Sequence, residues 1–151
     1  MNKTVILVLA LVLSLSVCSS VSALDENKKT CIQIIGSSDD QLGQVLIYNV
    51  KELIRSSENF ILISNDDQTK EEYFQLYINT MPYEEEPPYN CTIYNIVWTY
   101  CSEKLTLGLP FYLDTTCGYV GSVYIKNTAE SIIAQTDEKI ENILKVTRKA
   151  K

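Results

Sequence analysis

Histidine is absent from this chain of 151 residues. That absence excludes Ser–His and Cys–His nucleophilic pairs, general catalysis by imidazole and the usual catalytic zinc sites. No segment of the sequence has the spacing of a calcium loop or of paired catalytic carboxylates. The sequence therefore gives no reason to assign a catalytic, cofactor-binding or metal-binding residue, and we expect a protein that is not an enzyme.

Basic residues are in deficit as well. The chain has 13 Lys and Arg against 19 Asp and Glu, for a formal net charge of −6. Nucleic acid partners require a basic protein face, so the composition argues against them.

Long hydrophobic runs are also missing. The longest one, 5–13, follows Lys3 and leads into small residues ending at Ala23, whereas a membrane span needs about 20 apolar residues. This layout is typical of a secretory signal peptide cleaved after Ala23. Acylation of Cys18 is the alternative, but the bulky Val17 precedes it where a lipoprotein signal prefers a small residue. We expect a signal peptide at 1–23, then a single periplasmic or secreted domain at 24–151 with no transmembrane segment.

Four cysteines remain after that cleavage. An even number in a small exported domain predicts two disulfides, with three possible connectivities. Cys91 and Cys101 bound one predicted strand, which would separate them by about 33 Å, whereas bonded cysteines need Cα atoms within about 7 Å. We therefore expect each of them to pair with Cys31 or Cys117, in an order that the sequence leaves open.

Periodicity predicts an α+β fold. Alternating or β-rich runs predict strands at 31–35, 60–63, 72–80 and 91–101, with a short fifth at 109–114. Apolar residues at helical spacing predict helices at 39–57, with Ser38 as N-cap and Gln41 completing a capping box, and at 127–146. We expect two layers: a mixed, mostly antiparallel sheet of four to five strands, with both helices on one face. The first strand–helix–strand unit should be parallel, and antiparallel hairpins should follow.

Aromatic residues recur along two of these strands. Tyr73 and Tyr77 share one strand face, and Tyr94, Trp98 and Tyr100 share another. If the two faces coincide opposite the helices, they form an aromatic surface suited to binding a partner. The alternative is that Tyr94 and Trp98 point into the core.

A glycine-rich segment precedes the last helix. Gly118, Gly121 and Ser122 could cradle an anion with free backbone N–H groups, and a free Cys117 beside them could act as a reactive thiol. The alternative is a tight turn with positive φ, in which Cys117 is held in a disulfide.

Acidic residues gather in two predicted loops, 66–67 and 84–86. Neither has the spacing of a calcium loop, so each is either a solvated loop or a contact for a basic partner.

Four segments together, 48–57, 78–81, 93–99 and 118–122 (the last followed by Ala129 and 136–137), resemble small exported bacterial proteins of unassigned function. The strand–helix–strand start also resembles the amino-terminal domain of the periplasmic protein TolB. That resemblance implies a module that docks to partners.

The favoured interpretation is an exported, non-enzymatic interaction module that binds another exported or envelope protein. Its acidity suits an inhibitor or immunity-type role against a basic target. The alternatives are a thiol-dependent enzyme or redox protein using Cys117 and a small-anion binder at 118–122.

Overall fold

The structure is a computed structural model that describes residues 29–64, 71–83 and 90–149. The predicted signal peptide, Cys18 and both acidic runs, 66–67 and 84–86, lie outside these residues.

The described chain is built around one sheet of five strands, β1 (Thr30–Ser38), β2 (Phe60–Ile63), β3 (Glu72–Pro82), β4 (Cys91–Ser102) and β5 (Phe111–Gly121), in the order β2-β1-β3-β4-β5. β1 is parallel to both of its neighbours, whereas β3–β4 and β4–β5 are antiparallel. The mixed sheet and the parallel first unit are confirmed. The antiparallel pairing of the strands that follow is confirmed for β3, β4 and β5, and β3 pairs with β1 on the side away from β2.

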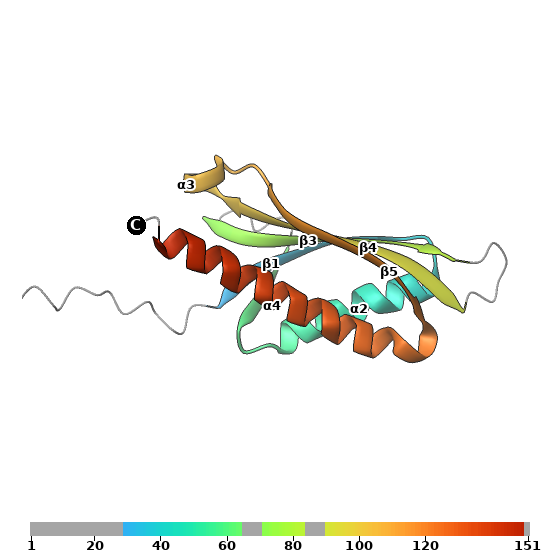
Figure 1. Cartoon of the computed structure of the whole chain (residues 1–151). Helices are drawn as coiled ribbons and strands as arrows, with labels where there is room; N and C mark the ends of the chain where they lie inside the picture. The colour runs from blue at the N-terminus through green and yellow to red at the C-terminus, as the bar shows by residue number, and fades with distance from the viewer. Residues whose placement is uncertain (1–28, 65–70, 84–89, 150–151) are drawn as a thin grey trace, which may run out of the picture.

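Both long helices, α2 (Gln41–Ser56) and α4 (Ile125–Lys149), cover the same face of the sheet and lie against each other (Figure 1). This is the predicted two-layer arrangement. Two short helices, α3 (Glu103–Thr106) and η1 (Ser122–Tyr124), flank β5 in the sequence. No described helix is both long and apolar enough to cross a membrane.

The core lies between the sheet and the two helices. Alternate residues of the central strands supply one side of it, such as Ile32, Leu76 and Ile96, each completely buried. Trp98 lies at its centre with 1% of its surface exposed, and its Nε1 donates a hydrogen bond of 2.9 Å to Thr136 Oγ1 on α4. This bond ties the C-terminal helix to the middle of the sheet.

The start of α2 differs from the prediction. Asp40, not Ser38, is the N-cap: its Oδ1 accepts a 2.7 Å hydrogen bond from the Gly43 N–H. The second carboxylate oxygen accepts 2.7 Å from Thr92 Oγ1 on β4. Because Asp40 is nearly buried, this one side chain joins the helix start to the β3–β4 hairpin.

Candidate functional site

The two aromatic groups lie on opposite faces of the sheet. Tyr73 pairs with Cys101, and Tyr77 pairs with Val97. These pairs alternate along the strands with the buried pairs of the core, so both tyrosines point away from the helices. Trp98 and Tyr100 point into the core, with exposures of only 1% and 6%.

Tyr94, on the same face of β4 as Trp98, is partly buried and packs against the core. The expected aromatic surface of five residues is therefore wrong, because the register of β3 on β4 separates its two halves. We call the face that carries Tyr73 and Tyr77, opposite α2 and α4, the outer face.

A polar cluster occupies the middle of the outer face. Gln75 Nε2 donates a 2.6 Å hydrogen bond to Gln33 Oε1. Gln75 Oε1 accepts from Thr99 Oγ1 at 3.1 Å, Tyr77 OH at 3.2 Å and Cys101 Sγ at 3.3 Å. Buried polar groups that are fully bonded are rigid. Sequence reasoning missed this cluster, because alternation places Gln75 on a face without showing what lies opposite it.

Cys31 and Cys101 come to the same row of the outer face but do not bond. Ile32 pairs with Phe74, so Cys31 lies level with Tyr73, and Tyr73 pairs with Cys101. Two strand spacings, about 9.5 Å, separate the cysteines, beyond the reach of a disulfide.

Cys91 and Cys117 are also free thiols. Cys91 pairs with Gly121, whereas Cys117 pairs with Asn95. Cys117 therefore lies four residues along β5 from the residue opposite Cys91. As predicted, the continuous strand β4 keeps Cys91 and Cys101 apart. The prediction of two disulfides, however, is wrong in this structure.

The thiol of Cys101 has low reactivity as a nucleophile. Burial raises its pKa, while a hydrogen bond with Tyr73 acts in the opposite direction. Burial likewise raises the pKa of Tyr73. A buried thiol with a raised pKa is a poor nucleophile.

The glycine-rich segment does not form the predicted turn or anion cradle. Gly118 lies inside β5, and only Leu107 and Gly108 have positive φ among the described residues. A Cβ on Gly118 would lie 2.6 Å from the Tyr94 hydroxyl, so the glycine makes room for that ring. Because β5 continues to Gly121, the backbone of residues 118–121 is part of the sheet.

Ser122 begins the three-residue helix η1, which has no side-chain cap. Cys117 is exposed on the outer face with the amide Asn95 opposite it, which supplies no general base for thiol catalysis. Among the described residues, no group of three or more metal-ligating side chains gathers.

The most exposed part of the outer face lies at the β3–β4 hairpin end. Across β3, β4 and β5, two rows of paired residues form what we call the hairpin-end patch: Asn79, Asn95 and Cys117 in one row, Met81, Ile93 and Tyr119 in the next. Met81 and Tyr119 are 54% and 77% exposed. Tyrosine and methionine flanked by amides are typical of protein-binding surfaces.

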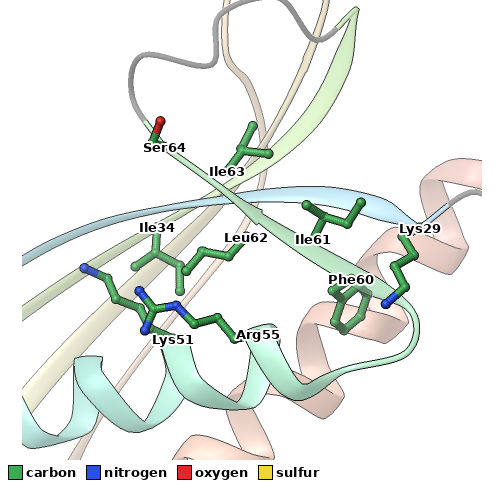
Figure 2. A pocket seen from close by; sticks show the side chains of 9 residues that line it. All are labelled: Lys29, Ile34, Lys51, Arg55, Phe60, Ile61, Leu62, Ile63 and Ser64. Carbon is green, nitrogen blue, oxygen red and sulfur yellow. The ribbon is translucent and has the colours of Figure 1, made fainter.

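An open pocket of about 630 Å³ lies between α2 and the edge strand β2 (Figure 2). Apolar side chains such as Phe60 and Leu62 line it, and its cations are Lys29, Lys51 and Arg55. Such a lining suits an anionic group attached to an apolar one.

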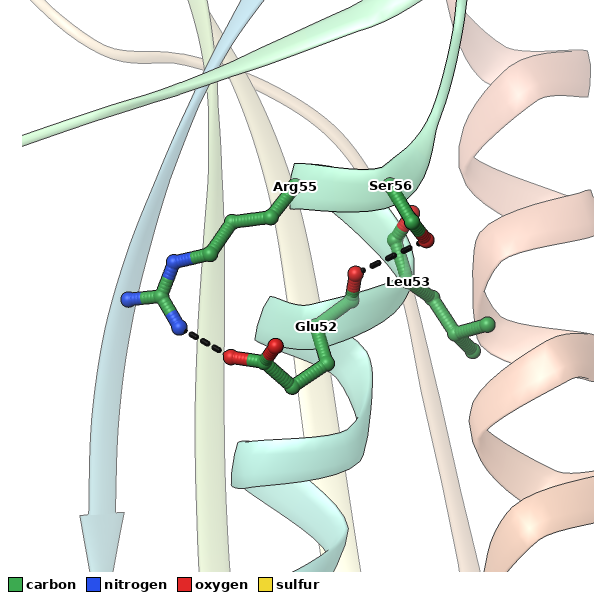
Figure 3. Close-up of polar contacts among 4 residues, drawn as sticks. All are labelled: Glu52, Leu53, Arg55 and Ser56. Carbon is green, nitrogen blue, oxygen red and sulfur yellow. Dashed lines mark hydrogen bonds and ion pairs between the residues drawn. The ribbon is translucent and has the colours of Figure 1, made fainter.

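Two of the pocket's three cations are already engaged. Arg55 forms an ion pair with Glu52 one turn earlier on α2 (Figure 3). The Nζ of Lys29 donates to the Ser57 carbonyl oxygen at 3.2 Å. These partners lower the pocket's capacity to hold an anion, so the hairpin-end patch is the stronger candidate site.

No protein-family model matches the chain, and no curated protein does either. Among solved structures, it is similar to the PelC dodecamer from Paraburkholderia phytofirmans, with 9% identity, a TM-score of 0.44, and coverage of 72% of this chain and 85% of that one. A hypothetical protein from Chlamydia trachomatis is similar at 8% identity and a TM-score of 0.38, over 60% of this chain and 70% of that one. Lipoprotein GNA1162 from Neisseria meningitidis is similar at 10% identity and a TM-score of 0.35, over 75% and 99% respectively. Nothing about the function of this chain follows from likenesses at this level.

Proposed function

We propose that the protein is an exported, non-enzymatic interaction module that binds another exported or envelope protein through the hairpin-end patch. The observation that carries the proposal is the exposure of Met81 and Tyr119, which lie in the same row of the outer face on either side of Ile93. The sequence supports export through its signal-peptide pattern at 1–23.

The form of the patch supports a protein partner. It consists of paired strands, and a row of apolar side chains lies beside the amides of Asn79 and Asn95. Interfaces between proteins combine an apolar centre with hydrogen-bonding groups in this way. The bonded cluster around Gln75 borders the patch and holds the neighbouring rows in place before a partner arrives.

The charge supports a basic partner. Tyr83, which is exposed, comes directly after the end of β3, and Glu84 to Glu86 follow it in the sequence. Complementary charge at the rim of an interface speeds association and excludes wrong partners. An inhibitor or immunity-type role is the specific form of this function that the acidity favours.

The test places a photo-crosslinking amino acid at position 81 in the protein expressed in its native host. A matched control places it at Val146 on α4, which is 65% exposed and therefore at least as accessible as Met81. The expected result is one crosslinked protein from position 81 that is absent from position 146. The purified partner should then bind Met81→Arg at least about 10-fold more weakly than the unmodified protein, whereas Val146→Arg should leave binding unchanged. Equal binding by both variants would contradict the proposal.

A further inference from the structure

The two edges of the sheet differ in length. β2 forms one edge and has only four residues, a length that limits unwanted strand pairing. β5 forms the other edge and has eleven residues, or about 36 Å of extended backbone. Along that length one side of β5 faces no other described strand.

β5 carries none of the devices that usually protect an edge over most of its length. It contains no Lys, Arg or Pro, and its one charged residue is Asp114. The carboxylate of Asp114 lies 2.5 Å from the Lys139 Nζ, so its charge is neutralised within the chain. A bulge opposite Trp98 and Thr99 interrupts the strand near its start and leaves 114–121 regular.

Exposed apolar side chains flank both ends of this edge. They are Leu109, Phe111 and Tyr112 at its start and Tyr119, Val123 and Tyr124 at its end. An antiparallel pair of identical strands brings the start of one strand against the end of the other. The two groups of exposed side chains would therefore cover each other in a symmetric pair.

We infer that β5 pairs antiparallel with β5 of a second copy of this chain, which joins two five-stranded sheets into one. The partner is a second copy because two-fold pairing requires a self-complementary strip, and the apolar groups at both ends of β5 supply one. Asp114, the one charged residue of β5, is paired with Lys139 of its own chain, so the strip brings no unpaired charge to the second copy.

The bulge limits the possible registers, and the side-chain pairs that form decide between them. Regular pairing is confined to 114–121, and a two-fold axis at Cys117 uses 114–120 of both copies. Thr115 then lies opposite Tyr119 of the second copy, a β-branched and aromatic pair of the kind that stabilises sheets. Val123, which is 84% exposed in the single chain, lies just beyond the paired strip at the end where the start of the second copy's β5 arrives. The two Cys117 residues face each other directly.

The experiment measures the mass of the full secreted chain by light scattering and sedimentation across micromolar concentrations. A dimer is expected for the unmodified protein and for Cys117→Ser. Cys117→Lys, which places two like charges at the axis, should weaken the dimer by at least about 100-fold. Val123→Asp is a second variant that alters only the exposed end, and it should weaken the dimer too. Circular dichroism of each variant confirms that it is folded.

Cross-linking tests the register independently. Directly opposed residues have Cα atoms about 4.5 to 5.5 Å apart, within the range of a disulfide. Diamide, which takes up the two hydrogen atoms as the bond forms, should link the unmodified dimer through Cys117 and should not link Cys117→Ser. A monomeric unmodified protein, a dimer that Cys117→Lys leaves intact, or one that Ile61→Lys on β2 dissociates would each overturn the inference.

Discussion

The hydrogen bond between Trp98 and Thr136 offers a direct measurement of what holds α4 to the sheet. The Nε1 donates to Thr136 Oγ1 at 2.9 Å, and the same hydroxyl donates to the Ile132 carbonyl at 2.7 Å. Both side chains are almost completely buried. Thr136→Val keeps the shape of the side chain but removes the hydroxyl that accepts the hydrogen bond of the buried indole N–H.

The expected cost follows from leaving that donor unpaired. An unsatisfied buried polar group costs about 1 to 3 kcal/mol, so Thr136→Val should lower the free energy of unfolding by about 2 kcal/mol. With a urea dependence of about 2 kcal/mol/M, the unfolding midpoint falls by about 1 M. Trp98 is the only tryptophan of the chain, so its fluorescence reports the transition. Thr136→Ser keeps the hydroxyl and should cost about 1 kcal/mol for its lost methyl group.

A double-mutant cycle separates the bond from packing. In a Trp98→Phe background, followed by circular dichroism, Thr136→Val should cost clearly less than in the unmodified protein, with a coupling of at least about 0.5 kcal/mol. The reasoning is refuted if Thr136→Val is as stable as the unmodified chain. It is also refuted if the cost is the same in both backgrounds.

Three further outcomes are expected. Gly43→Ala places a Cβ 1.8 Å from the buried, unbonded Thr80 hydroxyl oxygen, and should lower the free energy of unfolding by about 3 kcal/mol or more. Thr80→Ala in the same chain should restore only part of the loss, because the Cβ of residue 80 and the Ser38 Oγ each remain 2.6 Å from the new methyl group. The pKa of Asp114 is lowered, chiefly by its hydrogen bond with Lys139, so the ionised carboxylate stabilises the fold at pH values above the ordinary carboxyl pKa. That stabilisation is lost as the pH falls through the lowered pKa. The melting temperature of Asp114→Asn should therefore lie below that of the unmodified protein at neutral pH and match it at about pH 2. Cys117, the most exposed thiol, should react first with a maleimide in the native protein, and mass spectrometry without reductant should show all four described thiols reacting in denaturant; a protected pair would contradict the free thiols of this structure.

The regular elements could be read from local pattern because each has a strong period. The strand 60–63 is predicted to the residue, and the helix expected at 39–57 is α2, Gln41–Ser56. The fifth strand was predicted to end at 114 but runs to Gly121. Glycine there indicated a turn, whereas Gly118 in fact accommodates the Tyr94 ring from a neighbouring strand. A contact between strands leaves no local signal.

The candidate site could be predicted only in part, for the same reason. Alternation correctly placed Tyr73 and Tyr77 on one face of their strand. It could not give the register against β4, which is what sends Trp98 into the core and leaves Met81 beside Ile93. Tyr119 was likewise missed, since its role depends on β5 continuing past the glycine.

The place of β1 in the sheet determines which shortened chains can fold. β1 pairs with β2 through Thr30 to Gln33 and with β3 through Ile32 to Ser38. β1 therefore joins the short edge strand β2 to the antiparallel strands β3, β4 and β5, although it is the first described strand in the sequence. We call this junction the seam. Removing residues before Lys29 leaves this seam whole. Removing ten more would take away β1 itself, so β2 would lose the only described strand that pairs with it and would no longer be joined to β3 through the sheet.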